Sequence, residues 1–166
     1  GLAPIVVAPD QLSSPSVNPM CIDSKAFGNS ETYLTQDVPD WIRAHFRVSA
    51  DPKMWGIEGF SQGGTCTTQL VTGHPRLFGS GIAILSQLGP ILRNVPSTVT
   101  QGFGGSTAAY QAAQPAAMMR AHGPYTDTML LFGSGAGDVK YTGFARTLHG
   151  EAQAAGMQTK LFIEPT

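Results

Sequence analysis

The sequence predicts an α/β fold in one domain, with a mostly parallel sheet flanked by helices. Short apolar runs rich in β-branched residues alternate along the 166 residues with segments of helical period. One of these runs leads directly into Gly59-Phe60-Ser61-Gln62-Gly63, and a helical segment follows at once. No linker or internal repeat divides the chain, so we expect residues 1–166 to belong to a single domain.

The strands are predicted from apolar runs that end at turn-forming residues. A run of this kind that is apolar throughout suits a strand buried on both faces of a parallel sheet. The predicted strands are 4–10, a run that begins at Met54 and leads into Gly59, 78–86, 128–133 and 159–164.

A helix is predicted over 30–46, where apolar residues recur at helical spacing. Three more are predicted over 64–71, directly after the serine motif, over the Ala-rich segment 106–113 and over 142–155. Pro39 is expected to kink the first helix or to divide it, and Gly156 suits the end of the last one. Residues 11–29 are rich in Ser, Pro and Asn, and we expect them to form a long loop that walls a site. The stretch from the third strand to Gln101 is predicted to be irregular.

Composition and charge exclude several classes of function. Charged residues make up only 13% of the chain and the formal net charge is -1, which gives no electrostatic basis for binding nucleic acid. No run of about eighteen apolar residues is present, so we expect no transmembrane segment in this chain. Cys21 and Cys66 do not have the spacing of metal ligands, and neither a metal nor a cofactor is expected. Cys66 is expected to be a buried apolar residue, and a disulfide between the two cysteines remains open.

The Gly-x-Ser-x-Gly motif predicts a nucleophile elbow, because a strand precedes it and a helix follows it. Ser61 is then the catalytic nucleophile, held at strained backbone angles. We expect positions 59 and 63 to require glycine, because a Cβ at either position would keep strand and helix from passing close together. The amide of Gln62 lies at the start of the helix and is expected to donate to an oxyanion. The alternative is an ordinary glycine-rich turn.

Asp138 is the predicted partner acid. It ends a Gly-rich turn that follows the strand 128–133, and its position after Ser61 matches the chain order Ser, Asp, His. Aspartate is also common in such turns for conformational reasons alone; Asp127 and Glu164 are the other candidates. Four histidines are present, at positions 45, 74, 122 and 149, and each is expected to be structural or solvated rather than a catalytic base.

Nearly the whole chain resembles the putative-esterase branch of the α/β hydrolases, which includes esterase D, the feruloyl esterases and the mycobacterial mycolyltransferases. The similar segments are 30–42, Gly63-Gly64 after the serine, 73–79, 103–105 and 161–165. The resemblance implies an α/β-hydrolase fold. It also implies a catalytic histidine beyond Thr166, and a strand before Gly1 whose loop gives the second oxyanion donor. We therefore expect a domain truncated at both ends.

The leading functional hypothesis is a serine esterase that hydrolyses a carboxylic ester through an acyl-enzyme intermediate. One alternative is an acyltransferase of the mycolyltransferase type, which moves the acyl group to a sugar hydroxyl. The other is a non-catalytic binding domain that keeps the fold. A small-molecule, lipid or carbohydrate ester is the expected substrate, and kinship with secreted proteins implies a place in the cell envelope or outside the cell. A sugar-stacking role for Phe27 and Trp41 is less favoured than a core position for Trp41.

Overall fold

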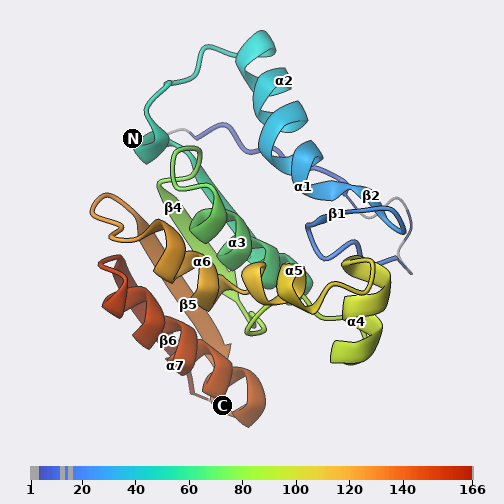
Figure 1. Ribbon diagram of the computed structural model, residues 1–166. Helices are drawn as coiled ribbons and strands as arrows, with labels where there is room; N and C mark the ends of the chain where they lie inside the picture. Colours follow the sequence, from blue (N-terminus) through green and yellow to red (C-terminus); the bar gives the residue numbers. More distant parts are fainter. Residues whose placement is uncertain (1–3, 12–13, 15–16, 166) are drawn as a thin grey trace.

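The protein is built around a four-stranded parallel sheet (Figure 1). The structure is a computed structural model that describes residues 4–11, 14 and 17–165. The strand order is β3-β4-β5-β6. These strands span Gly56–Phe60, Ser80–Ile84, Met129–Gly135 and Gln158–Glu164. The predicted α/β class is therefore confirmed, and all four strands end at the same edge of the sheet because they run parallel.

Three helices cover one face of this sheet (Figure 1): α3 (Gln62–Gly73), α6 (Pro115–His122) and α7 (Val139–Ala154). Helix α3 packs on β3 and β4, while α7 packs on β5 and β6. The interface between the helices and the sheet holds the largest fully buried aliphatic and aromatic side chains, which are Leu70, Val71, Leu130, Phe132 and Leu148. This core fixes the direction of α3 relative to the strand that precedes it.

The opposite face of the sheet is open over the described residues. Alternate strand residues point to this face, and several large apolar ones are between 40% and 65% exposed: Phe60, Ile82, Ile84, Met129 and Phe162. Parallel sheets normally bury both faces. In the part of the chain that the structure describes, only the helical face is covered.

The prediction of a strand at 4–10 is wrong. These residues are irregular, and Ile5 and Val6 are 50% and 81% exposed. A strand forms only when its N–H and C=O groups pair with a neighbour, and no described segment pairs with this one. The composition of the segment indicates a preference for β structure, but it does not reveal whether a neighbouring strand is there to pair with.

The predicted helix over 30–46 consists of three consecutive pieces: α1 (Ser30–Thr32), a π-helical turn (Tyr33–Asp37) and α2 (Val38–His45). The Val38 N–H donates to the carbonyl of Tyr33, five residues back. This change of helix type directly precedes Pro39, which has no N–H to continue the ladder. Trp41 is 50% exposed and stacks on His45 with ring centroids 4.3 Å apart, so the core position predicted for it is wrong.

Two helices arise in regions where the sequence pattern was read as irregular or gave no helix. They are α4 (Val95–Gly102) and α6, and both carry a proline in their first turn. Proline is tolerated there because the first N–H groups of a helix have no intrahelical acceptor. The Ala-rich helix forms as predicted, as α5 (Thr107–Ala112), and a small hairpin of β1 (Asp23–Ser24) and β2 (Gly28–Asn29) lies within the predicted loop.

A disulfide joins Cys21 to Cys66 and closes a loop with a sequence separation of 45 residues. Cys66 is buried in α3, as expected. The sequence left open whether the two cysteines pair, and the structure shows that they do. The bond attaches the loop before α1 to the first half of α3. No helix within residues 4–11, 14 and 17–165 combines the length and the apolar character that crossing a membrane requires.

Candidate active site

Ser61 lies in a sharp turn between β3 and α3, at the carboxyl edge of the sheet. Its backbone angles are φ 55 and ψ -112, in a region that residues with a Cβ rarely adopt. The Ser61 N–H donates to the carbonyl of Ile84 at 2.8 Å, and the Ser61 carbonyl accepts from the Thr65 N–H at 3.0 Å. The strained residue is therefore held from both sides, by β4 and by α3, while Ser61 itself remains exposed.

Two glycines allow this turn, and one of them differs from the prediction. A Cβ on Gly59 would lie less than 3.0 Å from the backbone of Gly63, so Gly59 meets the predicted demand. A Cβ on Gly63 would meet nothing within 4 Å, and the expectation that Gly63 must lack one is wrong. The close approach falls one residue later, because a Cβ on Gly64 would lie less than 3.0 Å from the carbonyl oxygen of Ile84.

Gln62 is the first residue of α3, so its N–H has no acceptor within the helix. Its side chain turns towards the disulfide: Nε2 lies 3.2 Å from the Cys66 sulfur, and Oε1 accepts from Gln11 Nε2 at 3.2 Å. The Gln11 amide oxygen also accepts from the Ser30 hydroxyl at 2.7 Å. Sequence reasoning missed this cluster because its members are far apart in the chain.

Asp138 lies just after β5 and caps the N-terminus of α7, where its carboxylate accepts from the Tyr141 N–H at 3.3 Å. The residue is exposed at the same edge of the sheet as Ser61, with β4 between their two strands. Asp127 precedes β5 and so lies at the opposite edge. There it pairs with Lys53 at 2.9 Å, and this hydrogen bond raises the pKa of the Lys53 ammonium group.

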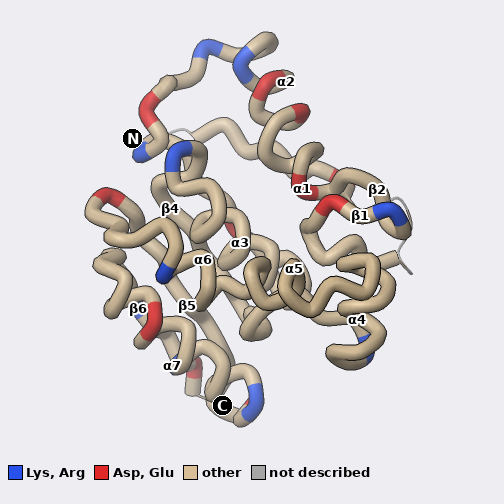
Figure 2. The backbone as a smooth tube through the Cα atoms, in the orientation of Figure 1, with Lys and Arg blue, Asp and Glu red and all other residues tan. Residues whose placement is uncertain are grey.

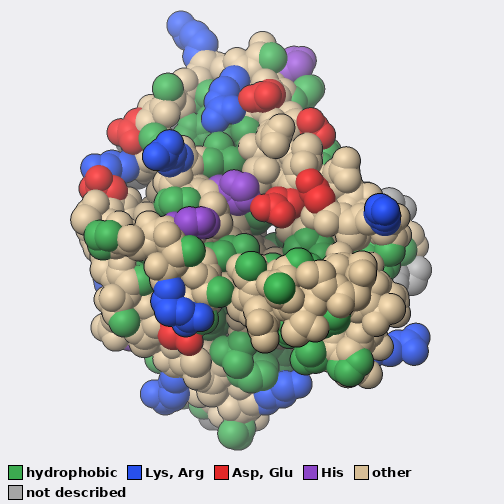
Figure 3. Space-filling view, in the orientation of Figure 1, with side chains coloured by type: hydrophobic (Ala, Val, Ile, Leu, Met, Phe, Trp, Pro, Cys, Tyr) green, Lys and Arg blue, Asp and Glu red, His purple; other side chains and the backbone are tan. Residues whose placement is uncertain are grey.

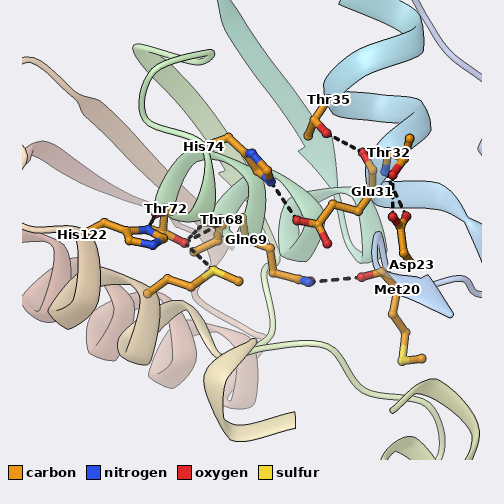
Figure 4. A network of polar contacts seen from close by, with 11 residues as sticks. Met20, Asp23, Glu31, Thr32, Thr35, Thr68, Gln69, Thr72, His74 and His122 are labelled. Carbon is orange, nitrogen blue, oxygen red and sulfur yellow. Dashed lines mark hydrogen bonds and ion pairs between the residues drawn. The ribbon is translucent and has the colours of Figure 1, made fainter. Parts of the chain in front are cut away.

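Two histidines lie at the far end of α3 from Ser61. The His74 Nε2 is 2.7 Å from a carboxylate oxygen of Glu31, and the His122 Nδ1 is 2.9 Å from the carbonyl of Thr72 (Figure 4). The twelve residues of α3 span roughly 18 Å at 1.5 Å per residue. Neither histidine is placed to take a proton from Ser61.

The other two histidines are also engaged elsewhere. His45 ends α2, where its ring stacks on Trp41 and its Nδ1 contacts the carbonyl of the same residue at 2.7 Å. His149 lies about three turns along α7 from Asp138, a distance of roughly 16 Å, and packs edge-on against Phe132. The four histidines therefore have the structural or solvated positions that were expected of them.

The polar contacts at the end of α3 join the helix to its neighbours. The His74–Glu31 pair links α3 to α1, and Figure 3 shows a histidine beside acidic side chains on this face. The Tyr125 hydroxyl donates to the carbonyl of Thr72 at 2.7 Å, and burial raises the pKa of Tyr125 to about 12. The hydroxyl therefore stays protonated as a donor at neutral pH, and these contacts serve the fold.

The helix that follows Ser61 is uncharged, as are two others. Helices α3, α4 and α5 contain no charged residue (Figure 2). Among the described residues, no group of His, Cys, Asp or Glu side chains is arranged to hold a metal ion. At the turn, Ser61 offers a hydroxyl and Gln62 a backbone N–H, and Asp138 offers a carboxylate two strands away.

A family model described as putative esterase matches residues 23–161. The chain belongs to the putative esterase family. An uncharacterized protein of Corynebacterium glutamicum is 44% identical over 115 residues, a match that covers 69% of this chain and 27% of that protein. This putative esterase chain therefore spans about a quarter of the length of the curated relative.

Solved structures show that the fold is that of the α/β hydrolases. An S-formylglutathione hydrolase from Agrobacterium tumefaciens superposes with a TM-score of 0.70 at 19% identity, covering 89% of this chain and 55% of that one. A ferulic acid esterase gives 0.67 at 15% identity, over 87% and 56% of the two chains. MPT51 of Mycobacterium tuberculosis gives 0.67 at 16% identity, over 87% and 64%. The putative esterase chain thus spans between 55% and 64% of the length of these structures.

The corrected role of the two adjacent glycines predicts a large difference between two similar variants. Gly64→Ala should destabilise the putative esterase by about 1–3 kcal/mol or more, the usual cost of overpacking, because its Cβ would meet the Ile84 carbonyl. Gly63→Ala should be neutral or stabilising by up to about 1 kcal/mol, since alanine is the better helix former and the space is open. Urea unfolding of both variants makes the comparison; equal losses of stability would contradict this assignment.

Proposed function

We propose that this chain is the catalytic part of a serine esterase, which hydrolyses a carboxylic ester through an acyl-enzyme intermediate with Ser61 as the nucleophile. The observation that carries the proposal is the positive φ of Ser61 between β3 and α3. A nucleophile elbow has this geometry, since the strained turn exposes the serine hydroxyl above the carboxyl edge of the sheet. An ordinary glycine-rich turn would place a glycine, not a serine, at the strained position.

The same turn supplies electrostatic stabilisation. When the Ser61 hydroxyl attacks the ester carbonyl, negative charge develops on the carbonyl oxygen. The Gln62 N–H has no acceptor within α3 and lies at the positive end of the helix dipole, so it is suited to donate to that oxygen. Nucleophile and oxyanion donor then belong to consecutive residues, and their separation is set by the backbone alone.

We assign Asp138 to the acid that orients the catalytic base. The base is proposed to be a histidine beyond Thr166, because the four histidines in the chain are engaged elsewhere. The end of β6 supports this arrangement: the carbonyl of Glu164 accepts from the Ala136 N–H at 2.9 Å, two residues before Asp138. Chain that continues past Glu164 therefore leaves the sheet beside Asp138, where a histidine could bond to its carboxylate.

The nucleophile is tested by covalent labelling of the full-length protein. A fluorophosphonate probe should modify Ser61, as located by peptide mass spectrometry, and Ser61→Ala should abolish the labelling. Hydrolysis of a short p-nitrophenyl ester should fall by several orders of magnitude, since loss of the nucleophile leaves only binding and the oxyanion donors. Labelling at another residue, or an active Ser61→Ala variant, would refute the assignment.

Asp138→Asn separates a catalytic role from a structural one. Asparagine caps a helix as well as aspartate does, so the cap on α7 and the free energy of unfolding should change little. Turnover should nevertheless fall by about three to four orders of magnitude, because an amide cannot stabilise the imidazolium that forms during attack. Steady-state kinetics and urea unfolding measure the two effects. Full turnover in this variant would move the acid elsewhere, with Glu164 as the next residue to test.

We further propose that the protein acts outside the cytoplasm. The Cys21–Cys66 disulfide supports the location, because structural disulfides persist mainly in oxidising compartments. If cells are lysed in acid and free thiols are alkylated at once, neither cysteine should react until a reductant is added. Complete alkylation of both cysteines before reduction would indicate a reducing compartment and would contradict the location.

A further inference from the structure

We propose that Thr65 is a positioning residue that sets the direction of the Gln62 N–H. The inference rests on the proposed function, in which that N–H donates a hydrogen bond to the oxyanion. Thr65 lies one turn into α3 and is only 4% exposed. Its effect would be transmitted through the peptide bond between Ser61 and Gln62.

The carbonyl of Ser61 and the N–H of Gln62 are opposite ends of one planar, trans peptide group. Whatever fixes the carbonyl therefore also fixes the N–H. The Ser61 carbonyl accepts two hydrogen bonds, from the Thr65 N–H at 3.0 Å and from the Thr65 hydroxyl at 3.2 Å. The first is an ordinary helical bond, while the second depends on the side chain at position 65.

A contact with the loop after β4 holds the Thr65 hydroxyl in place. The Gln87 N–H donates to the hydroxyl oxygen at 3.0 Å, which leaves the hydroxyl proton free to bond the Ser61 carbonyl. This loop follows Ile84, the last residue of β4, whose carbonyl accepts the Ser61 N–H at 2.8 Å. The strained residue is thus fastened at both its N–H and its carbonyl to one short segment, 84–87, and Thr65 is the link on the carbonyl side.

Other buried threonines of α3 provide matched comparisons. Thr72 is fully buried, and its hydroxyl donates to the carbonyl of Thr68 at 2.8 Å, within the half of the helix remote from Ser61. The Thr68 hydroxyl bonds the Gly64 carbonyl and the Ser86 hydroxyl, while the Thr67 hydroxyl has no hydrogen-bond partner among the described residues. Of these buried threonines, Thr65 is the one whose hydroxyl reaches the Ser61 carbonyl.

Thr65→Val keeps the shape of the side chain and removes the hydroxyl. The Ser61 carbonyl then loses one of its two donors, and the Gln87 N–H loses its acceptor. The Gln62 N–H becomes less firmly aimed, which matters most when the charge on the oxyanion has formed. The loss should therefore appear in kcat rather than in KM.

The test compares Thr65→Val, Thr65→Ser and Thr72→Val with wild type in the full-length protein. Thr65→Val should lower kcat for a p-nitrophenyl ester about tenfold to a hundredfold, somewhat less than outright removal of an oxyanion donor, and leave KM within about twofold. Phosphonylation by a fluorophosphonate should slow in parallel. Thr65→Ser should restore most of kcat, and Thr72→Val should lose stability without losing turnover.

Each outcome is decisive because unfolding midpoints are measured on the same samples. Wild-type kcat in a folded Thr65→Val variant would overturn the inference while the proposed function stands. So would an equal loss in Thr65→Ser, since the hydroxyl would then not be the cause, or an equal loss in Thr72→Val. A wild-type protein that does not react with the fluorophosphonate at Ser61 would instead overturn the proposed function, and this inference with it.

Discussion

The approach of α3 to the carbonyl of Ile84 is the constraint on which the site depends. That oxygen accepts the Ser61 N–H at 2.8 Å and leaves no room for a Cβ on Gly64. One residue separates β3 from α3, and its φ is positive. Ser61 occupies this position, and the buried contacts of Leu70 and Val71 with the sheet hold the helix against it.

Strain of this kind costs on the order of 1–3 kcal/mol per residue, and it persists because the surrounding packing over-determines the turn. The consequence is chemical. The strained backbone of Ser61 holds its side chain at the carboxyl edge of the sheet. The next residue, Gln62, presents an N–H that has no acceptor within α3. The Cys21–Cys66 disulfide and the Gln11–Gln62 hydrogen bond attach the loop 11–29 to the first half of α3, close to the turn.

Local signals predicted most of the sheet and the serine turn, because apolar runs, helical spacing and Gly-x-Ser-x-Gly are read within a few residues of one another. Features set by distant contacts were not predicted. The segment 4–10 has β-forming composition but no partner strand among the described residues, and Trp41 has core spacing on a helix with an exposed face. The need for glycine at 64 rather than 63 depends on the Ile84 carbonyl, twenty residues away in the chain. The cluster around Gln62 depends on residues from three separate segments.

The most direct test of this account is a crystal structure of the full-length protein after reaction with a fluorophosphonate, whose tetrahedral phosphorus mimics the acyl-transfer intermediate. We expect phosphorus bonded to the Ser61 oxygen, with the phosphoryl oxygen about 2.7–3.1 Å from the Gln62 nitrogen. Ser61 should keep its positive φ in the adduct. An adduct on another residue, or a phosphoryl oxygen directed away from the Gln62 N–H into solvent, would contradict the account.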